Sequence, residues 1–160
     1  MKQALALALA AGLFLPAAAR AQGKPDFSGT WTMDAAKSDP APQGRGGGGG
    51  GGGAQTVKQT ATELSVMTEG RGGQQTMTYK LDGSTSMNKV MGRGGEQEVK
   101  SVAKWDGSSL VIETTRDFQG MSITSKEVRR LDNGGKEMIV ETTTQTPNGE
   151  QKRKVVYTKS

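Results

Sequence analysis

Short runs of alternating apolar and polar residues constrain the fold of this chain more than any other feature. Met77, Tyr79 and Leu81 alternate with Thr78 and Lys80, so that one side of this run is apolar and the other polar. This period of two is typical of a β-strand with one face buried. It recurs at Leu110 and Ile112, at Met138 and Val140, and at Val155 and Tyr157.

Turn-forming residues separate these runs roughly every 8 to 12 residues. The clearest are "LDGS" at 81–84, "WDGS" at 105–108, "LDNGG" at 131–135 and "TPNGE" at 146–150. Asp-Gly and Asn-Gly readily adopt the positive φ angles of tight hairpins. The pattern therefore predicts an all-β antiparallel meander, with strands at 27–33, 55–60, 62–68, 74–81, 86–91, 96–105, 109–116, 120–130, 136–145 and 149–158.

The first residues, "MKQALALALAAGLFLPAAARAQ", have the layout of a secretory leader. Lys2 precedes an apolar run, Pro16 breaks it, and Ala19 and Ala21 form a small-x-small cleavage site. We predict a signal peptide at 1–21, a single domain at 22–160, and no membrane span after cleavage. The chain has no cysteine, and so no acceptor for a lipid anchor. A periplasmic or secreted location is expected.

Charge and composition exclude several function classes. Removing the leader lowers the formal charge from +5 by the two charges of Lys2 and Arg20, a weaker basic excess than most nucleic-acid-binding proteins carry. Without His or Cys, the usual zinc sites, Ser-His-Asp triads and cysteine nucleophiles are excluded. We predict no catalytic residues, no metal site, no cofactor and no nucleic-acid partner.

The motif "GRGG" occurs three times, at 44–47, 70–73 and 92–95, and the first copy continues into a glycine tract. An RNA-binding arginine-glycine box is disfavoured, because no Tyr or Phe interleaves the glycines. The inner two copies lie between predicted strands and are interpreted as turns. The first belongs to a Pro- and Gly-rich stretch, which predicts a flexible loop at 39–54.

Two terminal motifs carry a family resemblance. "PDFSGTWTMDAAKSD" at 25–39 resembles the first strand of the calycin superfamily, the lipocalins and fatty-acid-binding proteins, and "RKVVYTK" at 153–159 is similar to the last strand of the fatty-acid-binding branch. The segment "AKWDGSSLVIETTR" resembles an exported bacterial group of lipocalin-like proteins. The resemblance implies an up-and-down antiparallel β-barrel of about ten strands around a ligand cavity. Gly29 and Trp31 would then lie at the closed base.

Two features depart from the fatty-acid-binding branch. Its two-helix lid lies between the first two strands, where this chain has the glycine tract. Its Arg-x-Tyr carboxylate grip has Val155 in place of the arginine before Tyr157, although Arg153 lies on the same face. A fatty-acid site therefore does not carry over intact.

In such a meander alternate connections share one end of the barrel, so the three GRGG copies and the connection after Arg116 share a rim. We predict a monomeric binder of a hydrophobic or anionic amphipathic small molecule. Solubilising charge is the other interpretation of the rim arginines. The alternative function is a non-enzymatic envelope structural or interaction protein that presents the Gly-rich loop to a partner. The candidate ligand-binding residues are Arg45, Arg71, Arg93, Arg116, Met77, Tyr79, Arg153 and Tyr157.

Overall fold

The computed structural model describes residues 23–40, 53–70, 73–92, 95–118, 120–146 and 149–160. Their strands form one antiparallel sheet with the order β4-β3-β2-β1-β10-β9-β8-β7-β6-β5, which confirms the predicted all-β meander. The strands are β1 (Gly29–Met33), β2 (Gln55–Gln59), β3 (Glu63–Gly70), β4 (Gly73–Lys80), β5 (Thr85–Gly92), β6 (Gly95–Asp106), β7 (Ser109–Phe118), β8 (Met121–Asp132), β9 (Glu137–Thr146) and β10 (Gly149–Lys159). Each overlaps one predicted strand.

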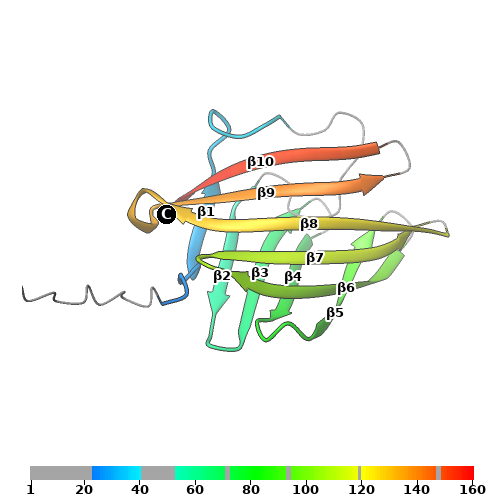
Figure 1. Cartoon of the computed structure of the whole chain (residues 1–160). Coiled ribbons are helices and arrows are strands. Elements are labelled where there is room, and N and C mark those ends of the chain that lie inside the picture. The colour runs from blue at the N-terminus through cyan, green and yellow to red at the C-terminus, as the bar shows by residue number, and fades with distance from the viewer. Residues whose placement is uncertain (1–22, 41–52, 71–72, 93–94, 119, 147–148) are drawn as a thin grey trace, which may run out of the picture.

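The sheet curls into a nearly closed barrel. In Figure 1, β6 to β10 run across the front of the molecule, and β2 to β4 lie behind and cross them steeply. β1 pairs with both β2 and β10, so the first and last strands are neighbours in the sheet. β4 and β5 are the two ends of the sheet and face each other across a seam.

The register fixes which side chains face the interior. Each pair from β5 to β10 keeps one constant register along its length, so a strand does not change faces along the barrel. The residues in register with buried Leu110 and Ile112 therefore define the inner wall. The buried inner core includes Trp31, Val57, Leu64, Tyr79, Ala103, Leu110, Ile112, Met138, Val140, Val155 and Tyr157.

The base of the barrel is closed by aromatic packing. Trp31 is fully buried, and its indole Nε1 donates to the Phe27 carbonyl at 2.9 Å. The ring of Phe27 stacks on Trp105 with centroids 6.1 Å apart. Gly29 has a φ of 138°, in the region that favours glycine, and lies against the Lys159 side chain. Gly29 and Trp31 thus lie beside Phe27 at this end of the barrel.

Two outer-face residues depart from the expected pattern. Ile139 alternates with the inward Met138 and Val140, a pattern that predicts exposure to water, yet only 8% of it is exposed. Its register partner Val156 is also buried. After β1 ends, the chain continues along β10, where the Asp34 amide donates to the Val156 carbonyl at 2.8 Å. The sequence pattern does not predict that the segment after β1, from Asp34 to Asp39, runs beside β10.

Three of the predicted turns, those at 81–84, 105–108 and 131–135, lie at the base end, and residues 147–148 of the fourth lie outside the described residues. Gly83 and Gly107 have φ angles of 83° and 58°, and the β8–β9 connection is the short 3-10 helix η1 (Asn133–Gly135). The β3–β4 and β5–β6 hairpins close with Gly70 opposite Gly73 and Gly92 opposite Gly95, at the other end. Among the described residues, no helix is long and apolar enough to span a bilayer.

Candidate functional site

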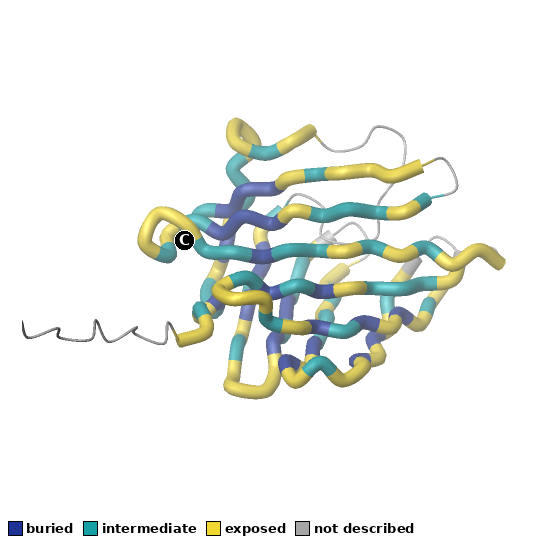
Figure 2. The backbone as a smooth tube through the Cα atoms, in the orientation of Figure 1, coloured by how far each residue is buried: buried dark blue, intermediate teal, exposed yellow. Residues whose placement is uncertain are grey.

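The inner wall changes from apolar to polar along β8, β9 and β10. Figure 2 shows the same change as burial: the deeply buried residues of β9 and β10 lie near the C-terminus, and the far halves of these strands are more exposed. Successive inward rows on these strands are about 7 Å apart, because a strand rises about 3.3 Å per residue. From base to rim they contain Leu131, Met138 and Tyr157; Arg129, Val140 and Val155; Glu127, Thr142 and Arg153; and Ser125, Thr144 and Gln151.

Arg129 is a charge buried inside the barrel. Only 4% of the residue is exposed. Its guanidinium forms an ion pair with Glu127 on the same face of β8, and Nη1 donates to Gln55 Oε1 on β2 at 3.4 Å. Burial acts to lower the pKa of Arg129, but the Glu127 carboxylate and the nearby tyrosines outweigh it, so the pKa is raised. Arg129 therefore stays charged.

Two polar groups on β2 and β10 have no hydrogen-bond partner within the described part of the chain. They are Nε2 of Gln55 and Nε of Arg153, and both atoms are buried. Gln55 as a whole is 4% exposed, and its carbonyl oxygen is already used by Arg129. Both unpartnered groups are N–H donors. A group that satisfies them has to supply acceptor oxygens.

Tyr79 and Tyr157 lie next to this charged pair. Burial raises the pKa of both phenols, and Arg129 opposes the increase in each. Glu127 also acts on both, in the direction that raises the pKa. The two tyrosines thus share the electrostatic environment of the Arg129–Glu127 pair. They stay protonated at neutral pH, and each phenolic oxygen can donate or accept a hydrogen bond.

Solvent reaches the inner wall from the rim end. Glu127 faces inward by register, and 22% of its side chain is exposed. Thr142 and Thr144 on β9 are also inward-facing and only partly buried. On the neighbouring strands the hydroxyls of Ser101 and Thr114 form a hydrogen bond of 3.0 Å. We call these inward polar residues, which span adjoining rows, the polar band: Gln55, Ser101, Thr114, Glu127, Arg129, Thr142 and Arg153.

The seam between β4 and β5 is joined by side chains. Asn88 on β5 accepts from the Thr78 amide at 2.8 Å and donates to the Thr78 carbonyl at 2.9 Å. Ser86 accepts from the Lys80 amide at 2.8 Å. Both bridging residues are inward-facing and buried. The side-chain amide of Asn88 and the hydroxyl of Ser86 thus take the place of backbone hydrogen-bonding groups. They join β4 to β5 and so close the barrel at this seam.

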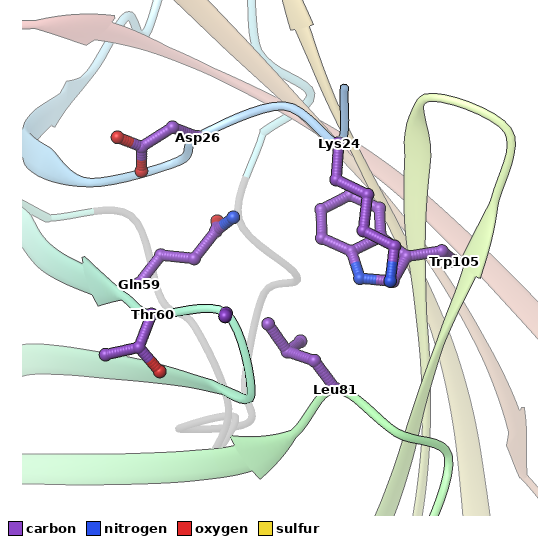
Figure 3. A pocket seen from close by; sticks show the side chains of 7 residues that line it. Lys24, Asp26, Gln59, Thr60, Leu81 and Trp105 are labelled. Atoms are coloured by element: carbon purple, nitrogen blue, oxygen red, sulfur yellow. The ribbon is translucent and has the colours of Figure 1, made fainter. Parts of the chain in front are cut away.

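A separate pocket lies at the base of the barrel. It has a volume of about 310 Å³ and is lined by residues of the N-terminal segment, the β2–β3 turn, the start of the β4–β5 turn and the end of β6. In Figure 3 the Lys24 side chain lies across the Trp105 ring, and the Lys24 nitrogen is 5.5 Å from the ring centroid. Trp105 Nε1 is buried and has no partner among the described residues. The full lining is Lys24, Asp26, Gln59, Thr60, Ala61, Leu81 and Trp105.

The structure brings together several residues that the sequence analysis selected. Arg153, Tyr157, Met77 and Tyr79 all belong to the inner wall, and Met77 packs against the core. Arg116 is on the inward side of β7, in register with buried Val99. The remaining candidates, Arg45, Arg71 and Arg93, lie outside the described residues.

Sequence reasoning missed the centre of this site, Arg129 and Glu127. In "KEVRRLD" the apolar Val128 lies on the opposite face from Leu131, so the pattern did not show which face was internal. Gln55 was missed because no local pattern links it to β8, which is 74 positions away along the chain. The adjacent arginines differ in environment: Arg130 is paired with Glu141 at the surface and Arg129 is buried. Only the register distinguishes them.

The described residues contain no group of three or more acidic or other metal-ligating side chains arranged for a metal ion. Comparison by sequence found no matching family model and no matching curated protein.

Comparison with solved structures identifies similar barrels. One is the zebrafish ileal bile acid-binding protein complexed with cholic acid, with a TM-score of 0.53 and 12% identity, covering 84% of this chain and 98% of that one. Another is a point mutant of the fluorescent protein UnaG, with a TM-score of 0.52 and 18% identity, covering 84% of this chain and 96% of that one. At these identities the likeness shows the fold, an all-β barrel of the fatty-acid-binding-protein type.

Proposed function

We propose that this protein is a non-enzymatic binder that holds a small molecule with an anionic or oxygen-rich head group inside its barrel. One observation carries the proposal: the buried Arg129–Glu127 pair lies beside unpartnered donors of Gln55 and Arg153 on a wall that solvent reaches. The barrel base is already closed by Trp31 and Phe27. The polar band is therefore the part of the interior that is suited to a ligand.

The energetics of burial support a binding role for the polar band. A buried ion pair is often no more stabilising than well-packed apolar residues of similar volume. An unpartnered buried donor costs roughly 1 to 3 kcal/mol. A barrel that needed only stability would do as well with apolar residues at both positions of the pair, 127 and 129. A ligand that brings acceptor oxygens to these donors would offset the cost.

The similar barrels support the class of ligand. The zebrafish protein was solved with cholic acid, a carboxylate on an amphipathic body. In this chain the carboxylate or other head group would lie near Arg129 and Arg153, and the rest of the molecule would extend along the inner wall toward the rim. Arg116 and the three arginines of the GRGG motifs, Arg45, Arg71 and Arg93, would draw an anion toward the mouth by long-range attraction.

Native mass spectrometry tests this function. The protein is purified without detergent, weighed under native conditions and then denatured to release any bound compound. We expect the native protein to have a reproducible extra mass, of the size of a small molecule, that is lost on denaturation. We also expect the protein to take up one molecule per barrel from an added mixture of metabolites and lipids. A clean mass that no small molecule changes would contradict the proposal.

We further propose that the protein works outside the cytoplasm, which rests on the leader-like residues 1–21, and that each barrel binds its ligand on its own, as a monomer. Expression of the full chain in a bacterium, followed by fractionation and N-terminal sequencing, tests the location. The expected product is periplasmic or secreted and begins at Gln22. A product that stays in the cytoplasm and begins at Met1 would contradict it. Sedimentation of the same product tests the oligomeric state.

A further inference from the structure

The inner wall of the barrel is hydroxyl-rich above its base, and this narrows the class of ligand. The row of Ser125, Thr144 and Gln151 lies one step nearer the rim than the Arg153 row, and the Ser101–Thr114 pair lies at the same level on the adjoining strands. On β2, β3 and β4 the inward positions toward the rim are Gln55, Thr68 and Gln75. Hydroxyls and amides thus line most of the described wall between the charged pair and the rim.

The apolar positions are confined to one sector of this wall. Val90 on β5, Val99 on β6 and Ile123 on β8 face inward toward the rim, as does Met121, which is 44% exposed. The sector from β9 through β10 to β4 has mainly Thr, Gln and Arg at the same level. A long alkyl chain that leaves the charged pair would desolvate these polar groups without giving them partners, which is costly.

The unpartnered groups add a requirement for acceptors. Gln55 Nε2 and Arg153 Nε are both donors, and both are buried. The charged side chains of the polar band are Arg129, Arg153 and Glu127, so positive charge is in excess among them. Serine and threonine hydroxyls act as donor and acceptor at once, and pair well with ligand hydroxyls.

From this arrangement we infer that the ligand is a polyhydroxylated carboxylate, of the chemical class of the sugar acids, and not an alkyl-chain fatty acid. The carboxylate lies at Arg153 and Arg129, and the hydroxyls bond to the Thr142, Thr144 and Ser125 side of the wall. The inference rests on the proposed function and names the chemistry of the ligand at the same site. Val90, Val99 and Ile123 contact the less polar face of a sugar ring.

Calorimetric titrations with three probes separate the contributions of the carboxylate, the hydroxyls and an alkyl chain to binding. Glucuronate has a carboxylate and hydroxyls, glucose has hydroxyls alone, and laurate has a carboxylate on an alkyl chain. We expect glucuronate to bind more tightly than either of the others. If laurate bound more tightly than glucuronate, or glucose bound equally well, the inference would be overturned. The proposed function, binding of a small molecule, would still hold. Binding of none of the three would also overturn it, and the native mass measurement would then decide whether the proposed function falls with it.

Two adjacent threonines on β9 supply a matched pair of variants. Thr142 faces inward in register with Arg153 and Glu127, and Thr143 faces outward opposite Lys152 and Lys126. We expect T142V to weaken glucuronate binding about three- to tenfold, the equivalent of one neutral hydrogen bond, and T143V to leave it unchanged. Equal effects of the two variants, or no effect of T142V on glucuronate, would contradict hydroxyl recognition at the polar band. Thermal unfolding of both variants controls for stability.

Discussion

Asn88 binds both backbone groups of Thr78, accepting from its amide at 2.8 Å and donating to its carbonyl at 2.9 Å. One side-chain amide thus does what a facing strand residue does elsewhere in the sheet. Together with Ser86 it joins β4 to β5, the two ends of the sheet. A fold that would otherwise be an open sheet is held as a barrel at this level.

Replacing Asn88 by alanine should loosen this seam. The change removes two hydrogen bonds and leaves the Thr78 amide and carbonyl without these partners, at a cost of roughly 1 to 3 kcal/mol in the free energy of unfolding. The Thr78 amide should also exchange its hydrogen faster. Chemical denaturation and amide exchange measure the two effects. The neighbouring K89A variant is the control, because the Lys89–Glu96 pair is exposed to solvent and should contribute little to stability. Unchanged exchange at Thr78 in N88A would refute this role.

The adjacent arginines of β8 should differ sharply in their effect on stability. R129M removes the ion pair with the partly exposed Glu127 and the hydrogen bond to Gln55, which should cost about 1.5 to 3 kcal/mol. R130M removes an exposed pair with Glu141 and should cost about 0 to 1 kcal/mol. The double variant E127Q/R129M should regain part of the loss, because no unpaired charge remains. Similar values for R129M and R130M in urea unfolding would contradict the burial of Arg129.

Alkaline pH should destabilise the barrel through its tyrosines. Tyr79 and Tyr157 are the only tyrosines of the chain. Burial raises the pKa of each above the ordinary value of about 10. A raised folded-state pKa gives stability that is complete below the unfolded pKa and is lost as pH rises above it. The free energy of unfolding should therefore fall above pH of about 10.

Phenolate absorbance measures this directly, since every phenol signal comes from the barrel interior. The native protein should titrate at higher pH than the same protein in denaturant. A native titration that overlays the denatured one would contradict the burial of both rings. The Y79F variant reports Tyr157 alone, and a bound ligand near Arg129 should shift that titration again.

Gly29 should resist substitution for two reasons. Its φ of 138° is unfavourable for other residues, and an added Cβ would lie 2.6 Å from Lys159 Cε. We expect G29A to lower the free energy of unfolding by about 1 to 3 kcal/mol. In a K159A background, G29A should lower the free energy of unfolding only slightly less than it does in the wild type. The contact with Lys159 is then gone, but the backbone strain at position 29 stays. Full recovery in that background would assign the whole effect to the side-chain contact.

The sequence predicted the strands well because their signals are local. Alternation at Met77 and Tyr79, and glycine at the turn position of Gly107, depend on neighbouring residues alone. Alternation fails for Ile139 because its burial depends on the arrangement around β10. The buried state of Arg129 depends on a partner in β2. Pairings between distant strands leave no local pattern, so the centre of the site became visible only with the register.

Native mass spectrometry of one blocking variant and its matched control tests the central claim, that a small molecule occupies the interior, most directly. Ser125 faces inward on β8 in register with Thr144, and Thr124 beside it is exposed on the outer face. S125W should fill the interior and abolish the ligand mass and the uptake of added compounds, and T124W should keep both. Both variants should fold, as judged by circular dichroism. Ligand retained by folded S125W, or lost equally from T124W, would contradict binding inside the barrel.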